Sequence, residues 1–83
     1  MLDTMTKAKT FEEALEAAQW RLYVFDKIGK SHKGITLFPT PKAADRRIDE
    51  LKAFLKQPNT AIDTLDGQVK SADISHIMRM PEI

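Results

Sequence analysis

Residues 20–25, W-R-L-Y-V-F, decide the fold of this chain because they suit two incompatible structures. The run is aromatic and β-branched, and it alternates well enough for a strand. Leu22 and Phe25 also extend the apolar face of the preceding segment at helical spacing, which favours a long helix capped by Gly29. A second β-prone run, I-T-L-F at residues 35–38, follows a polar stretch. We therefore favour a hairpin with a long loop and keep the long helix as the alternative.

A helix is predicted to begin just upstream of this run. Thr10 and Glu13 have the T-x-x-E spacing of a capping box, and Glu12 and Glu13 suit the positive end of a helix dipole. Residues 1–9 have no periodicity, so we expect a flexible N-terminal segment there. The apolar face of the predicted helix carries Phe11, Ala14, Leu15 and Ala18.

A second amphipathic helix follows residues 35–38. Thr40 suits its N-cap, Pro41 suits its first turn, and Pro58 stops it. About four turns of helical spacing separate these signals. The apolar stripe of this helix consists of Ala44, Ile48, Leu51, Phe54 and Leu55.

The C-terminal third indicates more strands. Asp66-Gly67 is the sequence of a type I′ turn, which predicts a tight hairpin with Ile62 and Val69 pointing inward. Residues 71–81 favour a last strand, and a short helix capped by Ser71 is the alternative.

Together these elements predict a small α+β domain over residues 10–83. Two amphipathic helices would pack on one face of a short antiparallel sheet. If residues 20–28 are helical instead, the chain becomes mainly α with a C-terminal β-hairpin. The chain has 83 residues, which is the length of one domain with a small core.

Composition restricts the class of protein further. The chain contains no cysteine, so it has neither a disulfide framework nor a thiolate metal site. No segment approaches the roughly 18 apolar residues of a membrane span, and the first residues lack the apolar run of a signal peptide. We expect a cytoplasmic protein without a membrane partner.

The stretch G-K-S-H-K-G at residues 29–34 begins like the end of a phosphate-binding P-loop. Val24 stands five residues before Gly29, where the motif needs a glycine, and a β-branched residue resists positive φ. The residues after Ser31 also start a helix poorly. We interpret the stretch as a solvated turn and not as a nucleotide site.

Other patterns for catalysis or metal binding are also missing from the sequence. His32 and His76 are 44 residues apart and belong to no H-x-x-x-H or H-E-x-x-H motif, while Asp73 and His76 are interpreted as a surface pair. The chain has no G-x-S-x-G elbow for a nucleophilic serine. We therefore expect a protein that is not an enzyme, with no catalytic residue, no metal and no cofactor.

Charge is distributed unevenly along the chain. Residues 21–56 carry nine Lys or Arg against four Asp or Glu, a net charge of +5, whereas residues 1–20 and 57–83 each carry −2. A basic middle favours an anionic partner. One hypothesis is therefore a nucleic-acid-binding protein that uses residues 27–56, with Trp20, Tyr23 and Phe38 as candidate stacking residues. Its candidate contacts are Lys27, Lys30 and Lys33, beside His32 in one loop, and Arg46 and Arg47 on the second helix.

The favoured hypothesis is a small accessory or regulatory protein that acts through protein–protein interaction, including self-association as a homo-oligomer. The sequence of the C-terminal hairpin predicts an open sheet edge that can pair with another copy. Met78 and Met80, in M-R-M-P at residues 78–81, are candidate interface residues because methionine side chains adapt to a partner.

Overall fold

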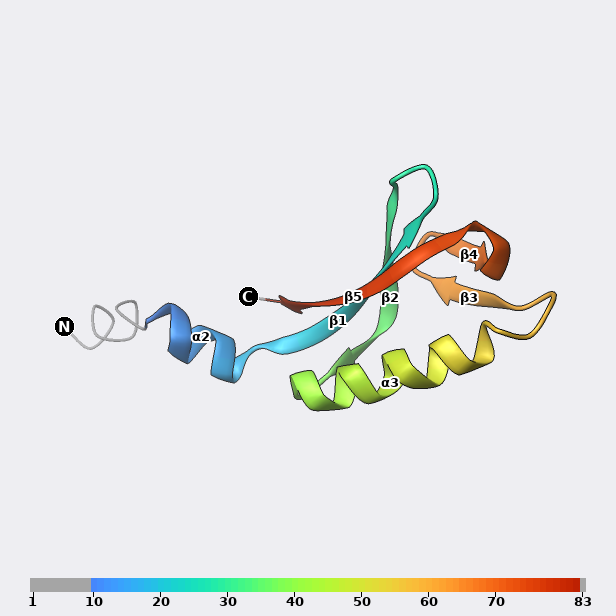
Figure 1. Cartoon of the computed structure of the whole chain (residues 1–83). Helices are drawn as coiled ribbons and strands as arrows, with labels where there is room; N and C mark the ends of the chain where they lie inside the picture. The colour runs from blue at the N-terminus through green and yellow to red at the C-terminus, as the bar shows by residue number, and fades with distance from the viewer. Residues whose placement is uncertain (1–9, 83) are drawn as a thin grey trace.

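The computed structural model describes residues 10–82, and the segment 1–9 that we expected to be flexible lies outside the described residues. A five-stranded antiparallel sheet of order β4-β3-β2-β1-β5 is covered on one face by a helix (Figure 1). The predicted α+β class is therefore confirmed. The elements are α2 (Phe11–Ala17), β1 (Gln19–Asp26), β2 (Ser31–Phe38), α3 (Pro41–Phe54), β3 (Ala61–Thr64), β4 (Gly67–Lys70), a 3-10 turn (Ser71–Asp73) and β5 (Ile74–Glu82).

The run W-R-L-Y-V-F forms most of β1, so the mainly helical alternative is wrong. Leu22 and Val24 are buried at alternate positions, which is the period of a strand. The hairpin loop is shorter than predicted because β2 already begins at Ser31. Asp26 closes this short loop, since its Oδ1 accepts the backbone N–H of Ile28 at 3.1 Å and of Lys30 at 2.9 Å.

Helix α3 begins as the sequence predicts. The Thr40 hydroxyl accepts the backbone N–H of Ala43 at 3.1 Å, and Pro41 occupies the first turn. The helix packs against β1, β2 and β5. No helix within residues 10–82 is long and apolar enough to cross a bilayer. The buried core consists of Ala44, Ile48 and Leu51 from α3 and Leu22, Val24, Ile62, Val69 and Ile77 from the sheet.

Helix α2 forms through its predicted capping box but does not pack on the sheet. The Thr10 hydroxyl accepts the N–H of Glu13 at 3.1 Å, and Glu13 Oε1 accepts the N–H of Thr10 at 2.9 Å. No side chain within α2 is buried, and the helix extends past the end of the sheet (Figure 1). The predicted packing of two helices on one face therefore holds for α3 and not for α2. Only Ala18 separates α2 from β1, which leaves no loop for the helix to turn back.

The C-terminal segment forms the predicted hairpin and last strand. Ile62 pairs with Val69, both are buried, and β4 lies at a sheet edge as expected. Gly67 has φ +118°, but the loop residues are 65–66, and Asn59 is the one non-glycine residue within 10–82 with positive φ. The predicted type I′ turn is therefore wrong, because that turn needs positive φ at both central residues. The Thr64 hydroxyl donates to Asp66 Oδ1 and lies close to the backbone oxygen of Gly67, which stabilises the turn that forms instead.

Leu51→Ala tests the core beneath α3. The Leu51 side chain is only 9% exposed, so its removal leaves a cavity among packed side chains. We expect the free energy of unfolding to fall by about 2–4 kcal/mol, measured by urea denaturation. Lys52→Ala, at the exposed neighbouring position, should change it by less than about 0.5 kcal/mol. Equal effects of the two substitutions would contradict this packing.

Gly34→Ala tests the closest approach of β1 and β2. A Cβ at position 34 would lie 2.9 Å from the backbone oxygen of Leu22, so one strand must shift. We expect a loss of about 1–3 kcal/mol in the free energy of unfolding. Thr36→Ala, at an exposed position on the same strand, is the matched control and should be nearly neutral. An unchanged denaturation midpoint for Gly34→Ala would show that the strands are not in this contact.

Candidate functional site

The most distinctive surface is the sheet face opposite α3. Because side chains alternate along a strand, burying Leu22 and Val24 under α3 turns Arg21, Tyr23 and Phe25 to the opposite side. No helix of residues 10–82 covers that side (Figure 1). We call this surface the uncovered face and define it by Arg21, Tyr23, Phe25, Lys33, Leu37, His76, Met78 and Met80.

Strand register brings these residues into cross-strand rows. Phe25 and His76 stack with ring centroids 4.6 Å apart and planes within 5° of parallel. Directly paired side chains on one sheet face lie close enough to touch. The other two rows are Leu37–Arg21–Met80 and Lys33–Tyr23–Met78.

Three polar side chains are hydrogen-bonded on the uncovered face, where Arg21 and Tyr23 both bond to Glu82. Arg21 Nε donates to Glu82 Oε1 at 2.8 Å, and the Tyr23 hydroxyl donates to Glu82 Oε2 at 3.3 Å. Arg21 also donates to the backbone oxygen of Gly34. The hydrogen bond from Arg21 lowers the pKa of the Glu82 carboxyl, while burial and Glu82 raise the pKa of Tyr23. The central side chains are thus held in place at neutral pH, which suits a preformed binding surface.

Both methionines predicted as interface residues lie on the uncovered face. Met78 is 46% exposed, Met80 is half-buried, and both belong to the edge strand β5. Leu37 is 41% exposed on the same face. The sequence analysis missed Leu37 and the contribution of Arg21 to this surface. Positions out of phase with Leu22 and Val24 were the available signal, but the grouping depends on the strand order β2-β1-β5.

A second feature is an Asp–His–Asp cluster at the other end of the sheet. His32 Nε2 lies 2.9 Å from Asp26 Oδ2, and His32 Nδ1 lies 3.1 Å from both carboxylate oxygens of Asp66. The Thr64 hydroxyl donates to Asp66 at 2.7 Å, and Lys30 Nζ lies 3.7 Å from it. The side chains of His32 and Asp26 are each 13% exposed. Both ring nitrogens are therefore occupied, and the protonated ring donates from each.

This cluster links the two hairpins where the sheet is weakest. Strands β2 and β3 pair through Gly34 and Thr64 alone. His32 bridges Asp26 of β1 to Asp66 in the β3–β4 turn, so it adds side-chain bonds across this junction. Hydrogen bonds to the two carboxylates raise the pKa of His32, and the same bond lowers the pKa of Asp26. A structural role explains every contact of the cluster.

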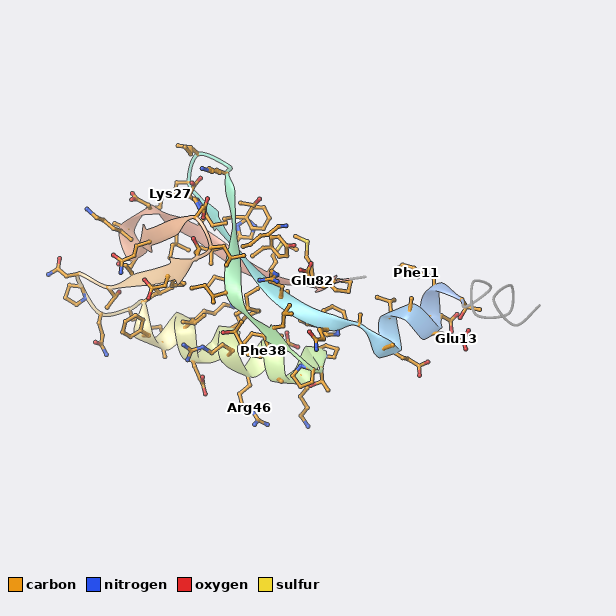
Figure 2. The ribbon with its side chains drawn as sticks, turned by 180° about the vertical axis from the view of Figure 1, so that it is seen from behind. Phe11, Glu13, Lys27, Phe38, Arg46 and Glu82 are labelled. Carbon is orange, nitrogen blue, oxygen red and sulfur yellow. The ribbon has the colours of Figure 1, made fainter. Side chains whose placement is uncertain are left out.

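The predicted anion-binding cations do not form one surface. Lys27 lies in the β1–β2 loop, in the upper part of Figure 2, and Arg46 projects from the outer side of α3, at the bottom of the same view. Lys30 faces Asp66, and Arg47 Nη1 lies 3.1 Å from Glu50 Oε1. The remaining candidate, Lys33, points from β2 into the row with Tyr23 and Met78.

The G-K-S-H-K-G stretch is not wholly the solvated turn that we expected. Gly29, at φ +91°, and Lys30 belong to the turn, but Ser31 opens β2 where a P-loop would open a helix. His32, which we grouped with the cations of this loop, is instead enclosed by two carboxylates.

An apolar hollow lies between α3 and the β2–β3 junction. It has a volume of about 440 Å³ and is lined mainly by apolar side chains, among them Phe38, Leu51 and Phe54. Arg47 and Asp63 are the charged residues on its wall. Within residues 10–82, no group of three or more histidine, aspartate or glutamate side chains is arranged to hold a metal ion.

The Asp–His–Asp cluster predicts a pH optimum for stability. Because the folded pKa of His32 is raised, its contribution is complete below about pH 6.5 and is lost as the pH rises through the folded value. The Thr64 hydroxyl and His32 lower the pKa of Asp66 to about 2, so its contribution is present above about pH 4 and is lost as the pH falls toward 2. Urea denaturation should show greatest stability between about pH 4 and 6.5.

His32→Gln should remove most of the fall in stability on the alkaline side of this optimum. His76→Gln is the matched control, because His76 stacks on Phe25 and bonds to Ser75 instead of a carboxylate. If His76→Gln and His32→Gln change the pH profile equally, the cluster is not its source.

No protein-family model, curated protein or solved structure matches this chain. Function is therefore inferred from the geometry and chemistry of residues 10–82.

Proposed function

We propose that this chain is a small non-enzymatic accessory or regulatory protein that acts through protein–protein interaction, self-association included. The observation that carries the proposal is the uncovered face, which no helix of residues 10–82 covers. On it Tyr23 pairs with Met78, and Phe25 and Leu37 lie in the rows on either side of this pair. Aromatic residues, methionine and arginine are enriched at protein interfaces. A contiguous apolar patch on a small domain is typical of such a contact.

The arrangement within the patch also supports binding. Arg21 lies at the centre of one row, where its bonds to Glu82 and Gly34 hold it in a single orientation. Ordered anchors lose little side-chain entropy when a partner binds. Exposed Leu37 and Met78 flank this centre and offer apolar area that a partner can remove from water.

The non-enzymatic part of the proposal rests on how the titratable groups are used. Both nitrogens of His32 are bonded to carboxylates that stabilise the fold, so neither is directed at a substrate. Arg47, one of the two charged residues on the wall of the hollow between α3 and the β2–β3 junction, is paired with Glu50. These contacts favour a binding protein over a catalyst.

Nucleic-acid binding through residues 27–56 is the alternative proposal. It would require the hairpin cations Lys27, Lys30 and Lys33 to act separately from Arg46 and Arg47, given their positions in the fold. Titration of labelled oligonucleotides at low salt tests it, because phosphate contacts give an affinity that falls steeply with salt. Binding that is lost when all three lysines become Gln would favour this alternative.

Photo-cross-linking of the full-length chain tests the favoured function. A benzophenone amino acid at position 78 lies on the uncovered face, and the same group at position 65 lies at the β3–β4 turn. The native side chains Met78 and Leu65 are both apolar and exposed, so the two positions are matched in character and accessibility. We expect covalent adducts from position 78 in cells that express the chain, identified as self or partner by mass spectrometry. Equal yields from both positions, or none from position 78, would contradict the proposal.

A further inference from the structure

Helix α2 lacks the packing that a helix of its length needs. It has seven residues, none of them buried, and Phe11 is 66% exposed at its start. An isolated helix shorter than about 12 residues is marginal in water, and a capping interaction adds only about 1 kcal/mol. Phe11, Ala14 and Leu15 form one apolar stripe, and in Figure 2 Phe11 and Glu13 point to different sides of the helix. The stripe therefore needs a surface to cover it.

Residues 10–82 do not place such a surface against α2. Ala18 is the single residue between α2 and β1, and it is extended at φ −72° and ψ 147°. Figures 1 and 2 both show α2 beyond the end of the sheet. One extended residue spans only about 3.4 Å. The first pairs of β1, Gln19 with Glu82 and Trp20 with Pro81, follow Ala18 directly, so a turn of α2 back over the uncovered face would have to be made at Ala18 or at the cost of these pairs.

The dimensions of residues 10–82 also indicate that α2 projects from the sheet. Residues 10–82 measure 57 × 23 × 16 Å, and their radius of gyration is 15.7 Å. A compact domain of that length has a radius of gyration of about 11 Å. Residues 10–82 thus contain a projecting helix and an uncovered apolar face that the fold holds apart.

We propose that a second copy of this chain supplies the missing contact: in a two-fold symmetric dimer, α2 of each copy lies on the uncovered face of the other. This inference rests on the proposed function and names its partner. An exchange of this kind is isologous, so each copy gives one helix and receives one. It covers both unpartnered surfaces with a single arrangement.

Size and charge both favour this occupant. Seven helical residues span about 10 Å, close to the roughly 14 Å width of three adjacent strands. Helix α2 carries Glu12, Glu13 and Glu16 and no Lys or Arg. The uncovered face carries Arg21 and Lys33 against Glu82, so an acidic helix meets a surface that is basic on balance.

The absence of native cysteine makes a direct test available. Leu15→Cys, in the stripe of α2, and Met78→Cys, on the uncovered face, are made in separate full-length chains. After mixing and mild oxidation we expect a disulfide-linked heterodimer, detected on a non-reducing gel and by mass spectrometry at twice the 9.4 kDa of one chain. Phe11→Asp in the Leu15→Cys chain should reduce the yield at least tenfold. Leu65→Cys replaces Met78→Cys as the matched control and should give no heterodimer.

Two other outcomes overturn the exchange and separate it from the proposed function. If Met78→Cys chains link to one another and not to Leu15→Cys chains, the uncovered face mediates association without α2, so the proposed function stands and the exchange is wrong. If no pair forms a disulfide and sedimentation finds a monomer at about 100 µM chain, the second copy is not the occupant. Photo-cross-linking at position 78 then decides whether the face binds a different protein.

Discussion

Burial of Leu22 and Val24 under α3 is the constraint on which the rest of the structure depends. Strand β1 lies between β2 and β5, and Val24 is 1% exposed beneath the helix. Because the period of a strand is two, this burial also turns Arg21 and Tyr23 to the other face. A single helix long enough to cover one face then leaves the opposite face without cover in residues 10–82. The core and the candidate interface therefore have the same physical cause.

The junction between the two hairpins shows how a small sheet compensates for weak backbone pairing. Only Gly34 and Thr64 pair between β2 and β3, close to the position where β2 approaches the backbone of Leu22. Apolar packing of the second hairpin under α3 supplies part of the attachment. His32 and Asp66 supply a charged part that depends on the protonation of both partners. Histidine and aspartate are common in catalytic sites, but here they connect the β1–β2 hairpin to the β3–β4 hairpin.

In helix α2 the local capping interactions are formed although tertiary packing is missing among residues 10–82. Its capping box, between Thr10 and Glu13, satisfies backbone groups over three residues and forms without any packing surface. The apolar stripe of the same helix has no packing surface among residues 10–82, because Ala18 alone links α2 to β1. The proposed association between copies would reconcile a well-capped helix with an exposed Phe11.

The sequence by itself determined the helix caps at Thr10 and Thr40. It favoured strands at residues 20–25 and after residue 71, and the tertiary structure decided them against the helical alternatives. The sequence also indicated Met78 and Met80 as interface residues, a functional role that stays a prediction. Each of these signals lies within a few residues along the chain, where propensity and periodicity act. The position of α2, the grouping of Leu37 with Met80 and the two carboxylates around His32 were decided only by the tertiary structure. Asp66 is 34 residues from His32, and contacts over such separations depend on strand order and on which face α3 covers, which no local pattern encodes.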